Sequence, residues 1–242
     1  MADLTGKGAL VTGGSRGIGR AIVERLTADG ATVVFSYRED SAAATGVAER
    51  TGAHPVQADQ AARADLDRLF AAAEHVLPGL DILVNNAAVT GLKPIADVDE
   101  ETYDHVFAVN TKAVFLALQW AARVMRDDGR IVNISTLNTA VPGQTQALYT
   151  ATKAAVEQFA KVAARELGGR GITANSISPG ATDTDMLRAA NPPEALQQMP
   201  AFTALQRLGR PEDVAAAVAM LCGPDGAWIT GQNIRATGGL FL

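Results

Sequence analysis

Residues 9–19 read ALVTGGSRGIG, a short apolar run followed by a turn that contains four glycines. Glycine is needed where the backbone turns tightly or lies close to a ligand. The unpaired N–H groups of a helix that starts at such a turn can hold a pyrophosphate. The same pattern also serves as a plain strand-to-helix connection, so the context of the turn has to decide between the two interpretations.

The chain beyond this stretch alternates short apolar runs with longer segments of helical periodicity. This alternation predicts parallel strands joined by helices, and therefore a doubly wound α/β sheet with helices on both faces. We expect a single domain of the Rossmann type over residues 1–242, with a seven-stranded parallel sheet. The strands are expected at 9–11, 32–35, 54–58, 82–84, 130–134, 173–177 and 232–235, and the helices at 17–29, 41–51, 62–77, 99–126, 148–168 and 211–222.

The least regular stretch covers residues 182–210 and contains Asn191-Pro192-Pro193. It is expected beside the carboxyl ends of the strands, where it could close over a substrate as a lid. A surface loop with two short helices is compatible with the same pattern, so both interpretations stay open.

The composition excludes several classes of protein. A net charge of -5 offers no broad basic face for a nucleic-acid backbone. Three scattered histidines lack ligand spacing, and Cys222 ends an apolar helical run, which predicts a core residue and no metal site. No apolar stretch approaches the length of a membrane span, and no basic segment followed by an apolar run opens the chain. We therefore expect a cytoplasmic protein with no membrane partner.

The spacing of the turn, Thr-Gly-x-x-x-Gly-x-Gly over residues 12–19, resembles the cofactor motif of the classical short-chain dehydrogenases/reductases. The resemblance runs nearly end to end, and the joint order of its motifs makes coincidence implausible. Ala88 stands where the family has a glycine. The further motifs are Asn85-Asn86-Ala87-Ala88, Val109-Asn110-Thr111, Tyr149-Thr150-Ala151-Thr152-Lys153, Ser178-Pro179-Gly180 with Thr184, the segment 207–213, and Thr230-Gly231-Gln232.

The resemblance implies an NAD(P)-binding domain and a set of cofactor contacts. The contacts lie on the glycine turn and at the ends of the later strands, and the catalytic pair also touches the cofactor. The implied residues are Gly13, Ser15, Arg16, Gly17, Ile18, Gly19, Tyr37, Arg38, Asp59, Gln60, Asn86, Ala87, Tyr149, Lys153, Pro179, Gly180, Thr182 and Thr184.

The end of the second expected strand favours NADP(H) over NAD(H). Sites specific for NAD place an acidic residue there, against the ribose 2′-hydroxyl, whereas this chain has Tyr37 followed by Arg38. An arginine attracts a 2′-phosphate with paired donors. Arg16 resembles the second basic residue of family members that prefer NADP. Alternatively, both arginines are solvated surface charges, and Glu39 and Asp40 follow them closely.

Tyr149 and Lys153 lie four residues apart on an expected helix and therefore share one face. A tyrosine can give or take the proton of a carbinol oxygen, and a neighbouring cation favours the phenolate that acts as base. The resemblance makes this pair catalytic. It also implies that Asn110 holds a water that links Lys153 to solvent, while a helix-capping or kinking asparagine is the alternative.

The family's fourth catalytic residue is a serine, and the ungapped alignment places Thr136 at its position. Ser135 is adjacent, and neighbouring side chains on an extended segment point in opposite directions, so only one of the two can face the substrate. The count favours Thr136, which keeps a hydroxyl donor but adds a stiff methyl group. We expect a functional site with altered substrate tolerance.

Three functions are carried forward. The first is reduction of a small-molecule ketone, or oxidation of a secondary alcohol, with NADP(H). The chain is also similar to 3-oxoacyl-carrier-protein reductases, for which Arg170 could grip an acidic carrier protein, although Asp127-Asp128 lie where a basic residue would help. The third is a cofactor-binding relative without turnover. Helices 99–126 and 148–168 are apolar on several faces, which is typical of buried or interface helices. The resemblance implies that these helices pair in a homotetramer, or a homodimer.

Overall fold

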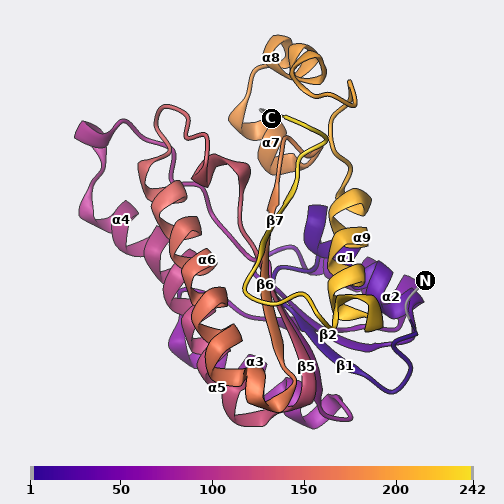
Figure 1. The fold of residues 1–242 in the computed structure, drawn as a ribbon. Helices are drawn as coiled ribbons and strands as arrows, with labels where there is room; N and C mark the ends of the chain where they lie inside the picture. Colours follow the sequence, from indigo (N-terminus) through magenta and orange to yellow (C-terminus); the bar gives the residue numbers. More distant parts are fainter. Residues whose placement is uncertain (1–2, 241–242) are drawn as a thin grey trace.

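The computed structural model describes residues 3–240, so the two residues at each end of the predicted domain lie outside the described part. Within that part, seven strands form one parallel sheet in the order β3-β2-β1-β4-β5-β6-β7, which confirms the predicted architecture (Figure 1). The strands are β1 (Gly8–Val11), β2 (Thr32–Tyr37), β3 (His54–Gln57), β4 (Leu80–Asn85), β5 (Met125–Ile134), β6 (Thr173–Pro179) and β7 (Asn233–Ala236).

Helices cover both faces of this sheet. α1 (Gly17–Ala28) and α9 (Pro211–Cys222) pack on one face, with α2 (Ser41–Thr51) beside α1. The other face carries α3 (Arg63–Val76), α5 (Ala113–Val124) and α6 (Ala147–Leu167). No helix within residues 3–240 is both long enough and apolar enough to cross a membrane.

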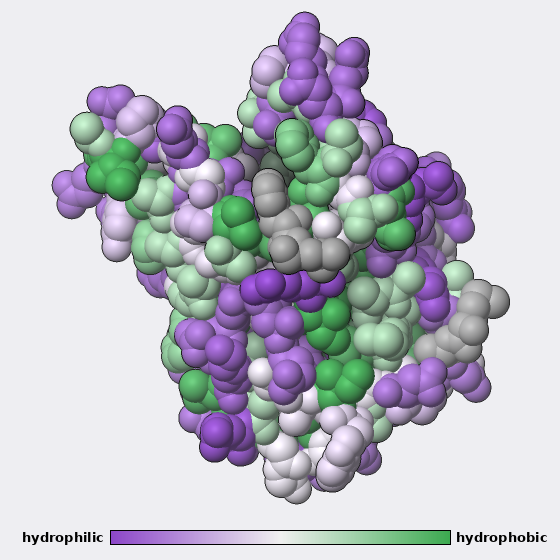
Figure 2. Space-filling model, turned by 45° about the horizontal axis from the view of Figure 1, so that its top comes forward, coloured by the Kyte–Doolittle hydropathy of each residue, from purple (hydrophilic) through white to green (hydrophobic). Residues whose placement is uncertain are grey.

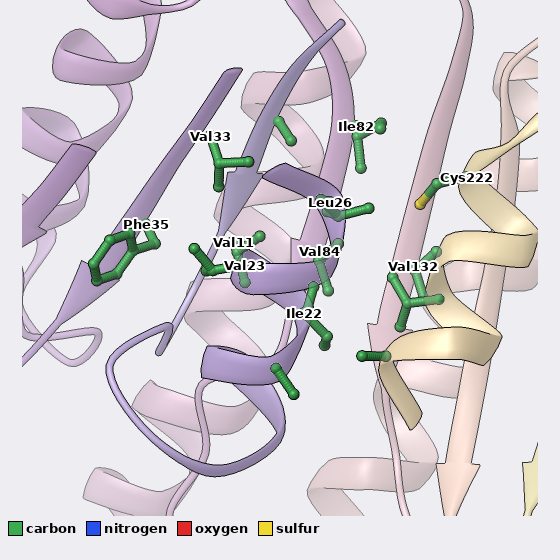
Figure 3. Close-up of a cluster of buried hydrophobic side chains, with 14 of the residues drawn as sticks. Val11, Ile22, Val23, Leu26, Val33, Phe35, Ile82, Val84, Val132 and Cys222 are labelled. Carbon is green, nitrogen blue, oxygen red and sulfur yellow. The ribbon is translucent and has the colours of Figure 1, made fainter. Parts of the chain in front are cut away.

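The inner strands β1 and β4 are buried along their whole length because helices cover both faces of the sheet, whereas the edge strand β3 is largely exposed. In β1, Val11 belongs to the core under α1 and α9 (Figure 3), whereas Leu10 belongs to the core on the opposite face. Phe35 and Val84 extend the first core along the neighbouring strands. Cys222 lies in the same core, and burial raises the pKa of its thiol to about 12. It is therefore a packing residue, as its sequence context predicted.

The expected single helix at 99–126 is wrong in two respects. It is divided into α4 (Glu100–Phe107) and α5 by a π-helical turn at Ala108–Lys112, and it ends at Val124 because Met125 already pairs with Leu80 in the sheet. The periodicity could not show the turn, since it accompanies bonds that the Asn110 side chain makes with the distant Val89 backbone. Met125 is buried, so in the pattern it looked like one more helical core residue.

Residues 182–210 leave the carboxyl end of β6 and return to it. The two ends are joined by bonds from Asp183 N to Gly209 O, 2.8 Å, and from Gly209 N to Ala181 O, 2.9 Å. Between them lie two short helices, α7 (Asp185–Ala190) and α8 (Pro193–Gln198), and a 3-10 turn at Met199–Phe202. This lobe stands above the strand ends opposite α4, and the surface is notched between the two (Figure 2).

Candidate active site

The glycine turn is tied to the end of β4. The Thr12 hydroxyl accepts bonds from the backbone nitrogens of Asn86, 2.9 Å, and Ala87, 3.1 Å. The Asn86 side chain donates in return to Thr12 O and Gly13 O, at 2.9 and 3.0 Å. The strand order reverses between β1 and β4, the position at which doubly wound sheets leave a crevice for ligands. The two motifs therefore meet at the expected binding edge.

The turn has the shape and the charge that a pyrophosphate needs. Gly13 and Gly17 have φ angles of 70° and 54°, and a Cβ atom on Gly19 would lie 2.0 Å from Gly13 O. No side chain caps the N-terminus of α1, and its first turn carries no acidic residue, so the positive end of the helix is not neutralised there. These residues fit a dinucleotide. The turn also lies against the lobe, since a Cβ atom on Gly17 would be 3.4 Å from Thr184.

The end of β2 forms the rim beside the turn. The Ser36 hydroxyl accepts bonds from Gly13 N, 3.0 Å, and from the Gln60 side chain, 3.2 Å. Arg38 is exposed and pairs at 2.9 Å with Glu39, one of the two acidic residues that follow it in the sequence. Asp59 accepts from Ala61 N at 2.8 Å, and so closes a turn after β3. The sequence did not indicate this role of Ser36, because a serine within a strand is an ordinary residue there.

Thr136 and Ser135 point to different partners. The Thr136 side chain lies beside the Tyr149 phenol, whereas Ser135 donates to Glu157 at 2.5 Å. Burial raises the pKa of Tyr149 above its usual value of 10, and the neighbouring Thr136 hydroxyl opposes that rise because it favours the phenolate. The geometry thus brings Thr136, and not Ser135, to the phenol.

Lys153 is fully buried one helical turn from Tyr149 on α6. Its Nζ lies 6.0 Å from the centre of the Tyr149 ring and donates to Ile134 O at 2.7 Å. Burial lowers the pKa of Lys153 to about 8, because the charged ammonium loses its hydration. A buried lysine beside a partly buried tyrosine, both with shifted pKa values, is typical of a catalytic site.

Asn110 lies in the π-helical turn and is fully buried. Its carboxamide accepts from Val89 N at 2.9 Å and donates to Val89 O at 2.8 Å and to Thr152 at 3.1 Å. It therefore connects the loop after β4 with the residue that precedes Lys153. A π-helical turn inside a helix is frequent at functional sites, and this one contains Asn110, the predicted site residue.

The end of β6 supplies the remaining predicted residues. Gly180 N bonds to Ala236 O at 3.1 Å, and the Thr182 hydroxyl folds back onto Gly180 O at the same distance. Thr184 caps α7 through Leu187 N. Pro179 ends the strand, so this turn lies at the same carboxyl edge as the glycine turn. Within residues 3–240, no cluster of His, Cys, Asp and Glu side chains could hold a metal ion.

The doubly wound sheet and the glycine turn define a protein of the Rossmann class. Comparison with known proteins narrows this class. The family described as enoyl-(acyl carrier protein) reductase matches residues 13–241. A short-chain type dehydrogenase/reductase from Picea abies is 40% identical over 251 residues, which cover 98% of this chain and 93% of that protein.

Two solved structures agree closely. A blue fluorescent protein from a metagenomic library, crystallised with NADPH, superposes with a TM-score of 0.94 at 38% identity, over 99% of this chain and 100% of the other. An angucycline C-6 ketoreductase with bound NADP superposes with a TM-score of 0.91 at 40% identity, over 99% and 97%. The chain belongs to the short-chain dehydrogenase/reductase family of oxidoreductases.

The buried Lys153 predicts a specific pH dependence of stability. Its folded pKa of about 8 lies below the unfolded value of 10.5, so between these values the unfolded chain binds more protons and stability rises with pH. Relative to Lys153→Met, the wild type should gain about 2–3 kcal/mol in free energy of unfolding between pH 7 and pH 10. Urea titrations at the two pH values measure this difference.

The exposed Lys161 on the same helix provides the control. In Lys161→Met, the change in free energy of unfolding between pH 7 and pH 10 should be close to that of the wild type. A wild-type advantage over Lys153→Met that shrinks as the pH rises would contradict a buried ammonium.

Proposed function

We propose that this protein is an NADP(H)-dependent oxidoreductase that interconverts a ketone and a secondary alcohol. The observation that carries the proposal is the Thr136 hydroxyl beside the Tyr149 phenol, next to the buried Lys153. A hydroxyl donor, a proton donor and a cation are what a carbonyl oxygen needs as it takes up negative charge.

The bound nicotinamide would supply or accept the hydride, and the proton is left to the protein. Burial raises the pKa of Tyr149, so its phenol keeps a proton at neutral pH and can give it to the carbonyl oxygen during reduction. In the opposite direction the Lys153 ammonium stabilises the phenolate that accepts this proton. Thr136 then donates its hydrogen to the substrate oxygen. Asn110 donates to Thr152 and thereby holds the π-helical turn against α6, next to Lys153.

The preference for NADP(H) rests on the rim at β2. Arg38 is exposed there, after Tyr37, and no carboxylate occupies the position at which NAD-specific sites bind the ribose. The 2′-phosphate competes with Glu39 for the Arg38 guanidinium. Structural neighbours crystallised with NADPH and with NADP support this choice.

The substrate is proposed to bind between the strand ends and residues 182–210, which act as its lid. Met186, Phe202 and Leu205 of this lobe are exposed apolar side chains, as is Val141 on the loop after β5. Such side chains favour an apolar ketone. The extra methyl group of Thr136 narrows the site beside the reacting oxygen and thereby restricts bulk at that position.

A carrier-protein-linked reductase is the second candidate, favoured by the description of the matching family. The contacts of Arg170 argue against this candidate, because they leave the residue poorly suited to bind a carrier protein. Its guanidinium pairs with Asp127 at 2.9 Å and donates to the carbonyls of Ala122 and Met125, so its donors are engaged within the chain. An acidic carrier would have to compete with these bonds.

We also propose a homotetramer, or a homodimer, formed through α5 and α6. Phe115 and Val162 on these helices are 50% and 52% exposed, and Phe115 rests against Phe159 with ring centres 5.6 Å apart. Exposed aromatic and branched side chains on adjacent helices are typical of protein interfaces.

The function is tested by following NADPH oxidation with a panel of simple ketones and one acyl thioester. We expect turnover with apolar ketones, and slower turnover with NADH. Turnover of the thioester alone would establish the second candidate. Binding of NADPH, seen by fluorescence, without oxidation by any member of the panel would identify a cofactor-binding relative that lacks turnover.

Substitutions at Thr136 test the hydroxyl assignment. Thr136→Ser should keep kcat within about threefold, since the donor remains, whereas Thr136→Val should lower kcat roughly a hundredfold, the effect of removing one donor to a developing oxyanion. Ser135→Ala is the matched control and should lose much less. A near-normal Thr136→Val together with an inactive Ser135→Ala would transfer the role to Ser135.

Arg38→Ala tests the cofactor preference. Loss of a charge-assisted bond to the 2′-phosphate should raise KM for NADPH by roughly tenfold or more and leave KM for NADH nearly unchanged. Arg123→Ala, an exposed change on the opposite side of the sheet, serves as the control. Equal losses with both cofactors would show that Arg38 supports the fold of the rim and does not select the phosphate.

A further inference from the structure

One polar cluster next to the site has no part in the proposed mechanism. Glu157, part-buried on α6, accepts hydrogen bonds from Ser135 at 2.5 Å and from Thr139 at 2.7 Å. Ser178 at the end of β6 lies 3.4 Å from the same carboxylate oxygen, although its closer partner is Asn233, at 2.8 Å. Glu157 thus binds residues on both sides of Thr136.

Glu157 continues the face of α6 that carries the proposed catalytic pair. Tyr149, Lys153 and Glu157 follow at intervals of four residues, and each contacts the last residue of β5 or the segment that follows it. Tyr149 meets Thr136, Lys153 donates to Ile134 O, and Glu157 holds Ser135 and Thr139. One helix face therefore fixes the whole segment.

The choice of hydrogen-bond donors supports this arrangement. The Thr139 hydroxyl has one hydrogen and two acceptors in reach, the Glu157 carboxylate at 2.7 Å and Thr136 O at 3.0 Å. The carboxylate is both closer and charged, so it takes the hydrogen. The hydroxyl oxygen of Thr136 accepts from Asn138 N at 3.3 Å, which leaves the hydroxyl hydrogen of Thr136 available to the phenol or to a substrate.

We propose that Glu157 is a positioning residue, which holds Ser135 and Thr139 so that the Thr136 hydroxyl points at the reacting oxygen. Thr136 caps the 3-10 turn Leu137–Thr139, and the two bonds to Glu157 anchor the residue before it and the last residue of that turn. A threonine has two bulky groups on Cβ, so a small rotation of this segment would exchange its hydroxyl with its methyl group. This inference rests on the proposed function of Thr136.

The test compares Glu157→Leu, Glu157→Gln and the exposed control Glu166→Leu on the same helix. Loss of the carboxylate should lower kcat for ketone reduction roughly tenfold, with KM for NADPH unchanged, because the donor is displaced while the cofactor contacts remain. Glutamine retains an acceptor oxygen and should restore kcat to within about threefold of the wild type. Glu166→Leu should match the wild type.

A double-mutant cycle separates positioning from general support of the fold. Glu157→Leu should have little further effect on kcat in the Thr136→Val background, since the group that it positions is already absent. Independent, multiplying losses from the two substitutions would overturn the proposal, as would a Glu157→Leu enzyme with normal kcat.

A crystal structure of Glu157→Leu gives a readout that does not need turnover. The Thr136 side chain should be rotated or its hydroxyl moved away from the Tyr149 phenol, and an unchanged Thr136 side chain would overturn the positioning role. If the wild type oxidises no NADPH with any ketone, the proposed function fails, while this structure still decides the role of Glu157. Should Glu157→Leu not fold, Thr139→Val removes the same bond from the other side at nearly constant volume and is analysed in the same way.

Discussion

Both faces of the central sheet are buried under helices, so a ligand reaches the strands at their ends and not across a face. In β1, neighbouring side chains enter two separate cores on the two faces. Ligands of doubly wound sheets bind at the carboxyl ends of the strands. Thr12, Asn86, Thr136 and Gly180 are far apart in the chain, and they follow the ends of β1, β4, β5 and β6 at this one edge.

The buried lysine shows what the site costs the fold. An ammonium without water is unfavourable, and the lowered pKa of Lys153 expresses that penalty. The single bond to Ile134 O compensates only part of it. Burial acts on Tyr149 in the opposite sense and raises the pKa of its phenol. Both shifts favour neutral groups in the free site, so the fold holds the pair in a less charged form than the interaction between the two groups alone would produce.

The sequence was sufficient for the sheet, the glycine turn and the Tyr149–Lys153 face, because each depends on local periodicity or on spacing along one helix. It was insufficient for features set by tertiary bonds. The π-helical turn at Asn110 accompanies bonds to Val89, and the roles of Ser36 and Glu157 depend on partners from other elements. No spacing rule could identify these two residues, since a strand serine and a helix glutamate are ordinary in their own segments.

Ser135 and Thr136 show how one pair of adjacent hydroxyls can serve two purposes. Both face α6, where Ser135 reaches the Glu157 carboxylate and Thr136 lies beside the Tyr149 phenol. A hydroxyl directed at Glu157 braces the segment, and a hydroxyl directed at Tyr149 is free to meet a substrate. Under the proposed function, the second position tolerates a threonine because its hydroxyl is retained, and the methyl group becomes part of the wall that the substrate must fit. That proposal assigns reactivity and selectivity to two groups on the same Cβ atom.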